Sequence, residues 1–209
     1  MGVYFTKSDL EIFHIPDFKS RMTAIREQLR PKLVALGEEL APQLKDRLGL
    51  DFFPHTAKHM RRKVNPPDET WVAWGPEARG YKAYIFFGFC VGKGGAQARV
   101  TMKDESKLRP DFGKNLQNNL SFLQKRFADF KKLGDYTKRN DHYEAQTVND
   151  FSSFIKLSSE RLQKNKTALF DVGLPLKALS KSIAQETLTA FENLFPFFQC
   201  GLRPKIKLI

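Results

Sequence analysis

The sequence contains very little cysteine, with only Cys90 and Cys200 in 209 residues, and the two lie far apart in the chain. So few cysteines cannot form a disulfide framework, and no CxxC pair is present to build a metal knuckle. Cys90 falls inside an apolar run, where burial raises the pKa of a thiol and keeps it unreactive. The sequence therefore excludes a disulfide scaffold and gives no support for cysteine catalysis.

The sequence also lacks any long hydrophobic run. The longest, residues 83–91, is interrupted by Gly88 and is far shorter than the roughly 20 residues that span a bilayer. No basic segment followed by an apolar one opens the chain as a signal peptide would. We therefore expect a cytoplasmic protein with no membrane partner.

Motifs of common enzyme classes are missing as well. The sequence has no GxSxG, no phosphate-binding P-loop, no GxGxxG and no paired DxD carboxylates. Residues 92–95 are rich in glycine, but they are predicted to join two strands instead of opening a helix. We therefore expect no cofactor, and whether the protein is an enzyme stays open.

What the sequence does contain is phenylalanine and positive charge. It has 19 phenylalanines, which predict a core built from aromatic rings. Its 35 Lys and Arg against 23 Asp and Glu give a net charge of +12, which favours anionic partners. The excess is densest in residues 51–103, which hold nine cationic residues, four acidic ones and two histidines.

Hydrophobic periodicity predicts a single α+β domain over residues 1–209. We expect a helical N-terminal part over residues 6–50, a sheet core over 69–103 and a helix-rich C-terminal part over 108–199. Thr6 and Asp9 have capping-box spacing, Pro31 and Pro42 are expected to divide the next helical stretch, and Gly49 is expected to end it.

The expected fold is an antiparallel sheet backed by long amphipathic helices. Predicted helices, apart from the N-terminal ones, cover 54–63, 108–130 and 176–198, with one more after Asp150. Predicted strands cover 69–74, 81–91, 96–103, 142–145 and 168–172, and a hairpin joins the second to the third. Gly88 either bends its strand or leaves room for a small cavity beside Cys90, Arg99 and Thr101.

Three strings, FTKSDLEIFHIPDF, RPKLVALGEELAP and FPHTAKHMRRKVNPPDETWVAW followed by RGYK, resemble the YktB-like family of uncharacterised bacterial proteins. This domain of unknown function occurs mainly in low-GC Gram-positive bacteria. The resemblance covers residues 4–90, and residues 91–209 share only the order of elements. It implies an α+β domain with a saddle-like sheet, backed by helices and built from two related halves. It implies no activity and no catalytic residue.

Four residues of the predicted helix 54–63 suggest a site, because His55, Lys58, His59 and Arg62 would share one face. A His-x3-His pair can bind zinc, but here no carboxylate or cysteine is near and the surrounding cations repel a metal ion. We therefore predict no metal. An anion site for phosphate or carboxylate fits better, and the alternative is a solvated basic face.

Arg79 and Lys82 flank the Gly80–Tyr81 turn and would join this cluster if the strands bring the turn back to it. The alternative is a loop with exposed charges. Trp71 and Trp74 differ in parity and so face opposite sides of their strand. One is expected in the core, and the other is a candidate stacking platform for nucleic-acid bases.

Three functions are compatible with these patterns. The first is a non-catalytic protein that binds a phosphorylated small molecule or nucleic acid through the six cationic and imidazole residues. The second is an enzyme that uses His55 or His59 as acid and base on a phosphorylated or carboxylated substrate. The third is an interaction module for an acidic protein partner. The oligomeric state stays open.

Overall fold

The computed structural model describes residues 2–60, 62–127, 137–141, 150–177 and 179–202. In these residues a six-stranded antiparallel sheet runs in the order β1-β2-β3-β4-β6-β5. Its strands are β1 (Phe53–Thr56), β2 (Glu69–Gly75), β3 (Ile85–Gly92), β4 (Gly95–Met102), β5 (Thr137–Asp141) and β6 (Ala168–Leu176). The predicted α+β class with an antiparallel sheet is confirmed.

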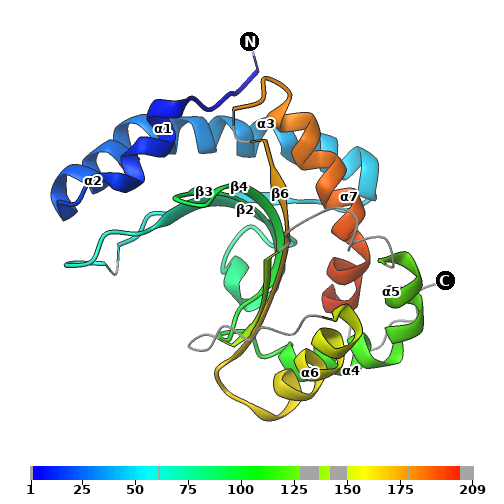
Figure 1. Cartoon of the computed structure of the whole chain (residues 1–209). Coiled ribbons are helices and arrows are strands. Elements are labelled where there is room, and N and C mark those ends of the chain that lie inside the picture. The colour runs from blue at the N-terminus through cyan, green and yellow to red at the C-terminus, as the bar shows by residue number, and fades with distance from the viewer. Residues whose placement is uncertain (1, 61, 128–136, 142–149, 178, 203–209) are drawn as a thin grey trace.

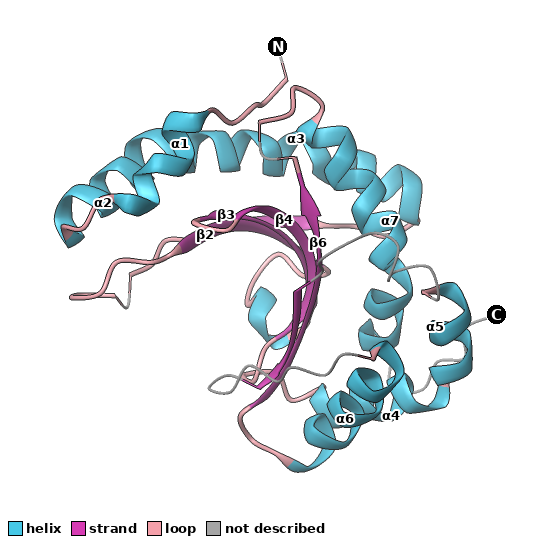
Figure 2. Ribbon diagram, in the orientation of Figure 1, coloured by secondary structure: helices cyan, strands magenta, loops and turns pink. Residues whose placement is uncertain are grey.

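The sheet is strongly curved, and the long helices lie on its outer, convex side (Figures 1 and 2). Helix α3 packs on β1 and β2, α7 packs on β3, β4 and β6, and α6 packs on β6. The helices are α1 (Lys7–Glu11), α2 (Phe18–Ala24), α3 (Arg30–Leu48), α4 (Arg109–Asn118), α5 (Leu120–Arg126), α6 (Phe151–Lys164) and α7 (Ile183–Leu202). These long helices do not cover the concave side of the sheet, where the candidate site lies.

The N-terminal helices follow the predicted signals closely. The backbone N–H of Thr6 donates to Asp9 Oδ2 at 2.6 Å in a capping box, and Gly49 ends α3 with a left-handed φ of 71°. A π-helical turn, Ile25–Leu29, ends two residues before Pro31, whose ring would clash with the preceding turn of a regular helix. Pro42 lies inside α3 without ending it, so the predicted division at that residue is wrong.

The hairpin of β3 and β4 forms as predicted, with Lys93 and Gly94 between the strands. All eight residues of β3 are buried, as expected of a central strand. The strand begins at Ile85 and not at the predicted Tyr81. Residues Tyr81–Ala83 instead form η3, a 3-10 turn that follows Gly80, whose φ of 66° suits glycine.

The core lies between the convex side of the sheet and the helices, and aromatic rings fill much of it. Phe87 of β3 stacks on Phe191 and Phe198 of α7, with ring centroids 4.6 and 4.5 Å apart. Trp74 of β2 is fully buried, and its indole N–H donates to the carbonyl oxygen of Gly37 in α3 at 3.0 Å. These contacts fix the sheet against both long helices.

Several predicted boundaries in the C-terminal half are wrong. The helix expected over 108–130 is broken at Asn119, whose backbone angles (φ −105°, ψ 14°) are not helical. The side-chain amide of Asn119 donates to the carbonyl oxygen of Asn115. The last helix begins at Ile183, because β6 extends to Leu176. The strand expected at 142–145 and residues 203–209 lie outside the described residues.

No helix among the described residues is both long enough and apolar enough to cross a bilayer. The division of the fold into two related halves stays a prediction.

Candidate functional site

The helix predicted over 54–63 does not form. Residues Phe53–Thr56 are instead strand β1, which pairs antiparallel with β2 so that Thr56 lies opposite Val72. The prediction was wrong because β1 lies at the edge of the sheet, where a strand tolerates Pro54. The next residue, Ala57, still donates its N–H to the carbonyl oxygen of Trp71 at 2.9 Å. The shared helical face of His55, Lys58, His59 and Arg62 therefore does not exist.

A different geometry nevertheless brings most of the predicted residues together. They line a hollow of about 610 Å³, here called the basic hollow. Its walls come from β1, the connection to β2, β2 itself and the turn η3. The lining residues are Pro54, His55, Thr56, Ala57, Lys58, His59, Met60, Arg62, Trp71, Tyr81 and Lys82.

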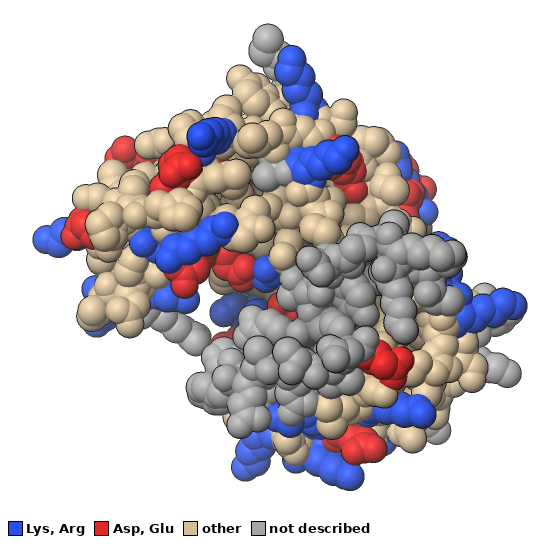
Figure 3. Space-filling view, viewed as in Figure 1, with Lys and Arg blue, Asp and Glu red and all other residues tan. Residues whose placement is uncertain are grey.

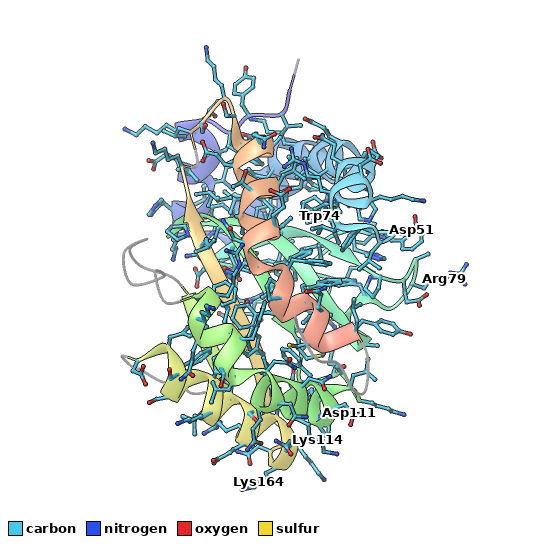
Figure 4. The ribbon with its side chains drawn as sticks, turned by 90° about the vertical axis from the view of Figure 1, so that its right-hand side faces the viewer. Asp51, Trp74, Arg79, Asp111, Lys114 and Lys164 are labelled. Atoms are coloured by element: carbon cyan, nitrogen blue, oxygen red, sulfur yellow. The ribbon has the colours of Figure 1, made fainter. Side chains whose placement is uncertain are left out.

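Arg79 is the predicted member that does not line the basic hollow. Its side chain is exposed, and Figure 4 shows it at the margin of the molecule, pointing away from the ribbon. The expected convergence of six cationic and imidazole groups is therefore a convergence of five. For Arg79 the alternative interpretation, an exposed charge on a loop, is the better description.

His55 is half-buried and lies flat against Tyr81, with ring centroids 4.8 Å apart and ring planes 20° apart. Its Nε2 atom is 3.1 Å from the carbonyl oxygen of Glu77. Because a carbonyl oxygen only accepts hydrogen bonds, Nε2 carries the proton in this contact. The two contacts hold the imidazole in place. The contact with Glu77 uses Nε2 and does not involve Nδ1.

His59 has unusual backbone geometry and an unusual acidity. Its φ is 51°, and it is the one non-glycine among the described residues with a positive φ. Its Nε2 atom is 3.0 Å from the hydroxyl oxygen of Thr70, and its ring packs edge-on against Trp71. Burial, and then the positive charge of Arg62, lowers its pKa to about 4. His59 is therefore neutral at physiological pH.

The cations of the basic hollow differ in their partners. Lys58 and Arg62 are exposed, and neither forms an ion pair with a carboxylate among the described residues. The guanidinium of Arg62 donates to the carbonyl oxygen of Asn65 at 3.2 Å. This acceptor is neutral and does not offset the positive charge of Arg62. Lys82 is half-buried, with its ammonium 3.7 Å from Glu105. Of the three cations that line the hollow, Lys82 therefore has a carboxylate partner, whereas Lys58 and Arg62 form no ion pair in the described part of the chain.

The tryptophans face opposite sides of β2 as predicted, since Trp71 lies opposite Cys90 and Trp74 opposite Phe87. Trp74 is fully buried on the helix side, as expected for one of the two, which leaves Trp71 as the candidate stacking platform. Trp71 faces the basic hollow. Its indole N–H donates to the hydroxyl oxygen of Tyr81 at 3.2 Å.

Tyr81 is the aromatic lining residue that sequence reasoning missed. It was treated only as part of a turn, although it supplies the ring on which His55 stacks and the hydroxyl that accepts from Trp71. Burial, its largest influence, raises its pKa, so the phenol stays protonated. The available signal was an aromatic residue between Gly80 and Lys82 in a predicted turn.

A second group of charged residues lies farther along the concave side. The guanidinium of Arg99 forms a fork with Glu69, with distances of 3.0 and 2.8 Å, and lies 3.7 Å from Asp171. Thr101 donates to Asp171 at 2.8 Å. A small hollow of about 190 Å³ beside this group is lined by Cys90, whose pKa burial raises to about 12. Because its charges are paired within the protein, this group is structural.

Net charge alone does not mark a binding face. On the side of the molecule in Figure 3, Lys and Arg lie next to Asp and Glu over the N-terminal helices at the top of the view. The basic hollow differs because two of its cations, Lys58 and Arg62, form no ion pair with a carboxylate in the part of the chain that the structure describes. Those residues also contain no group of three His, Cys, Asp or Glu that could hold a metal ion.

The curved antiparallel sheet, the helices on its convex side and the hollow at its edge define an α+β protein whose concave face carries both aromatic and charged side chains. The chain belongs to the family of the domain of unknown function DUF1054, whose model matches residues 5–198. The match confirms the resemblance to an uncharacterised bacterial family and extends it through the C-terminal part.

Related bacterial proteins cover nearly the whole chain. A UPF0637 protein of Bacillus velezensis is 34% identical over 174 residues, which is 83% of this chain and 81% of the relative. A UPF0637 protein of Lysinibacillus sphaericus is 30% identical over 202 residues, 94% of each chain. One of Exiguobacterium sibiricum is 30% identical over 205 residues, 95% of this chain and 98% of the relative.

Proposed function

We propose that this protein binds an anionic ligand, one that carries phosphate or carboxylate, in the basic hollow. Lys58 and Arg62 supply positive charge at its mouth, and Lys82, whose ammonium lies 3.7 Å from Glu105, adds a third cation to its lining. His55 and His59 contribute imidazole groups as hydrogen-bonding partners. Phosphate suits this set because Arg binds it with a planar fork and Lys as a point charge.

The observation that carries the proposal is that cations from separate segments meet around one hollow, and that two of them form no ion pair with a described carboxylate. Lys58 and Arg62 come from the connection between β1 and β2, whereas Lys82 comes from η3. Repulsion between like charges opposes this arrangement when no anion is bound. The left-handed backbone of His59 adds local strain, of a kind that is concentrated at functional sites.

Binding without catalysis is the better supported of the two chemical functions. A histidine whose pKa is about 4 is a weak base and is fully deprotonated at neutral pH, so His59 is poorly suited to acid–base work. The Nε2 proton of His55 is already donated to Glu77. Lys58, Met60 and Arg62 are exposed at the mouth, which leaves the hollow open to water.

The test compares two double variants that change the net charge equally. Lys58→Ala with Arg62→Ala removes two cations that line the hollow, and Lys63→Ala with Arg79→Ala removes two exposed cations that do not. Calorimetric titration with inorganic pyrophosphate should show binding by the wild type and the second variant. The first variant should bind at least about tenfold more weakly, because two charge-assisted contacts are lost.

Equal affinities of the two double variants would show that pyrophosphate responds to overall charge and not to the basic hollow, and would contradict the proposal. Binding of the protein to a heparin column and to single-stranded DNA, measured at several salt concentrations, shows whether its ligand is a nucleic acid or a small molecule. A nucleic-acid binder loses affinity steeply with salt, with a slope proportional to the phosphates contacted. An acidic protein partner would be indicated if neither anion bound specifically.

A further inference from the structure

The basic hollow has a gradient of polarity from its mouth to its inner wall. The side chains of Lys58 and Arg62 at the mouth are exposed, whereas His55, Trp71 and Tyr81 are half-buried. A site for a bare phosphate places its cations where the anion is enclosed. Here the half-buried part of the wall holds these three rings and one cation, Lys82, so the buried part of a ligand meets mainly flat and weakly polar surface.

The inner rings have their polar atoms occupied by protein partners. The Trp71 indole N–H donates to Tyr81, and the His55 Nε2–H donates to the carbonyl oxygen of Glu77. His59 is neutral because its pKa is about 4. What remains for a ligand is mainly ring surface, including the face of His55 opposite to Tyr81, since the two rings are stacked on one side only.

We propose that the anionic ligand is a nucleoside phosphate, an inference that rests on the proposed function. Its base extends the stack of His55 on Tyr81 beside Trp71, and its phosphate lies between Lys58 and Arg62 at the mouth. Aromatic side chains stack on any base, so this wall selects for a planar ring and not for one base.

The size of the hollow agrees with such a ligand. Its volume of about 610 Å³ lies within the range of small-molecule sites, and a phosphate alone would leave most of it filled with water. A free mononucleotide and the end of a nucleic-acid strand present the same chemistry to this wall, and the experiments below separate them.

The first experiment measures what the ring contributes. Calorimetric titrations of the wild type use the four common nucleoside 5′-monophosphates, ribose 5-phosphate and inorganic phosphate. At least one nucleotide should bind about tenfold tighter than ribose 5-phosphate, which is the order of the effect of stacking one base. Equal affinities would overturn this inference and leave the anion proposal standing. If no phosphate compound binds, both fail.

The second experiment locates the base. Tyr81→Leu should reduce the affinity for the nucleotide to that for ribose 5-phosphate without changing the latter. Tyr84→Leu, which changes a half-buried tyrosine outside the hollow, should leave both affinities as in the wild type. Tyr81→Phe keeps the ring and should keep the preference, which guards against a folding defect in Tyr81→Leu. A preference that survives Tyr81→Leu would contradict the inference.

The third experiment uses the intrinsic fluorescence of the protein. The chain has two tryptophans, of which Trp74 is fully buried on the opposite face of the sheet and serves as an internal reference. The bound nucleotide should quench Trp71, and Trp71→Phe should abolish the quenching while binding persists. Nucleotide binding to the wild type without quenching would place the base elsewhere and overturn the inference.

A series of oligonucleotides decides whether the ligand is a free mononucleotide or the end of a nucleic-acid strand. A single-stranded decamer with a 5′-phosphate, the same decamer without it and the mononucleotide are titrated at two salt concentrations. Equal affinity of the phosphorylated decamer and the mononucleotide, with a shallow salt dependence, would assign a free nucleotide. A much tighter decamer with a steep dependence would assign a strand. Failure of all three to compete with pyrophosphate would contradict the inference.

Discussion

The Nε2 atom of His59 lies 3.0 Å from the hydroxyl oxygen of Thr70, and this contact joins the loop after β1 to the first residues of β2. His59 reaches it with a left-handed backbone and with a pKa lowered from 6.5 to about 4, first by burial. The fold therefore holds a neutral imidazole between cations, and this has a consequence for stability.

Stability should fall as the pH falls from about 6.5 to about 4. In that interval the unfolded chain binds a proton at this residue and the folded one does not, so protonation favours unfolding. After discounting for partial exposure, the effect is at most roughly 2 kcal/mol. Urea denaturation of wild type and His59→Asn measures it, since Asn tolerates a positive φ and does not titrate. The same loss in both proteins would contradict the assignment.

Glu105→Gln should increase the affinity of the basic hollow for pyrophosphate. Glu105 lies 3.7 Å from the ammonium of Lys82 and partly neutralises it. The pair is substantially exposed and screened, so the expected gain is only roughly threefold at low salt. Calorimetric titration checks this, with Glu11→Gln as the control because that exposed carboxylate lies in α1, remote in sequence from the hollow. An equal gain in the control would point to net charge alone.

Gly37→Ala should destabilise the protein although alanine favours helices. A Cβ atom at residue 37 would lie 3.0 Å from side-chain atoms of Pro54 and Val72, where α3 packs on β1 and β2. Overpacking costs about 1–3 kcal/mol, which exceeds the helix-propensity gain of roughly 1 kcal/mol. Gly94→Ala is the control, because nothing lies within 4 Å of its Cβ position. Urea denaturation should separate the two, and a stabilised Gly37→Ala would contradict the packing.

Arg99→Met should cost about 3–5 kcal/mol, because Asp171 is buried and would lose the cation 3.7 Å from it, while Glu69 would lose both hydrogen bonds from the guanidinium. Adding Asp171→Asn should recover part of the loss by removing the buried charge. Denaturation of the single and double variants measures both effects. A single variant within about 1 kcal/mol of wild type would mean that the group behaves as an exposed ion pair.

Local signals were sufficient for several elements. The capping box at Thr6, the glycine that ends α3 and the hairpin at residues 92–95 depend on neighbouring residues, and all three were predicted. We also propose that residues 1–209 form a single domain, because α3 and α7, from opposite ends of the chain, pack on the same sheet and on each other.

The candidate site was only partly predictable, for a physical reason. Lys58 and Arg62 were chosen from a helical spacing that does not exist, and Lys82 from its place beside a turn, whereas the three meet because β1 pairs with β2. That pairing depends on contacts across the sheet, which periodicity in one segment cannot reveal. The partner of His55, Tyr81, is separated from it by β2 and was missed for the same reason.

The most direct measurement of the central claim is the crystal structure of the wild-type protein soaked in inorganic phosphate. We predict density for an anion in the basic hollow, within hydrogen-bonding distance of Lys58 or Arg62. Water alone in the hollow at saturating phosphate, with anions bound at other surfaces or nowhere, would contradict the account.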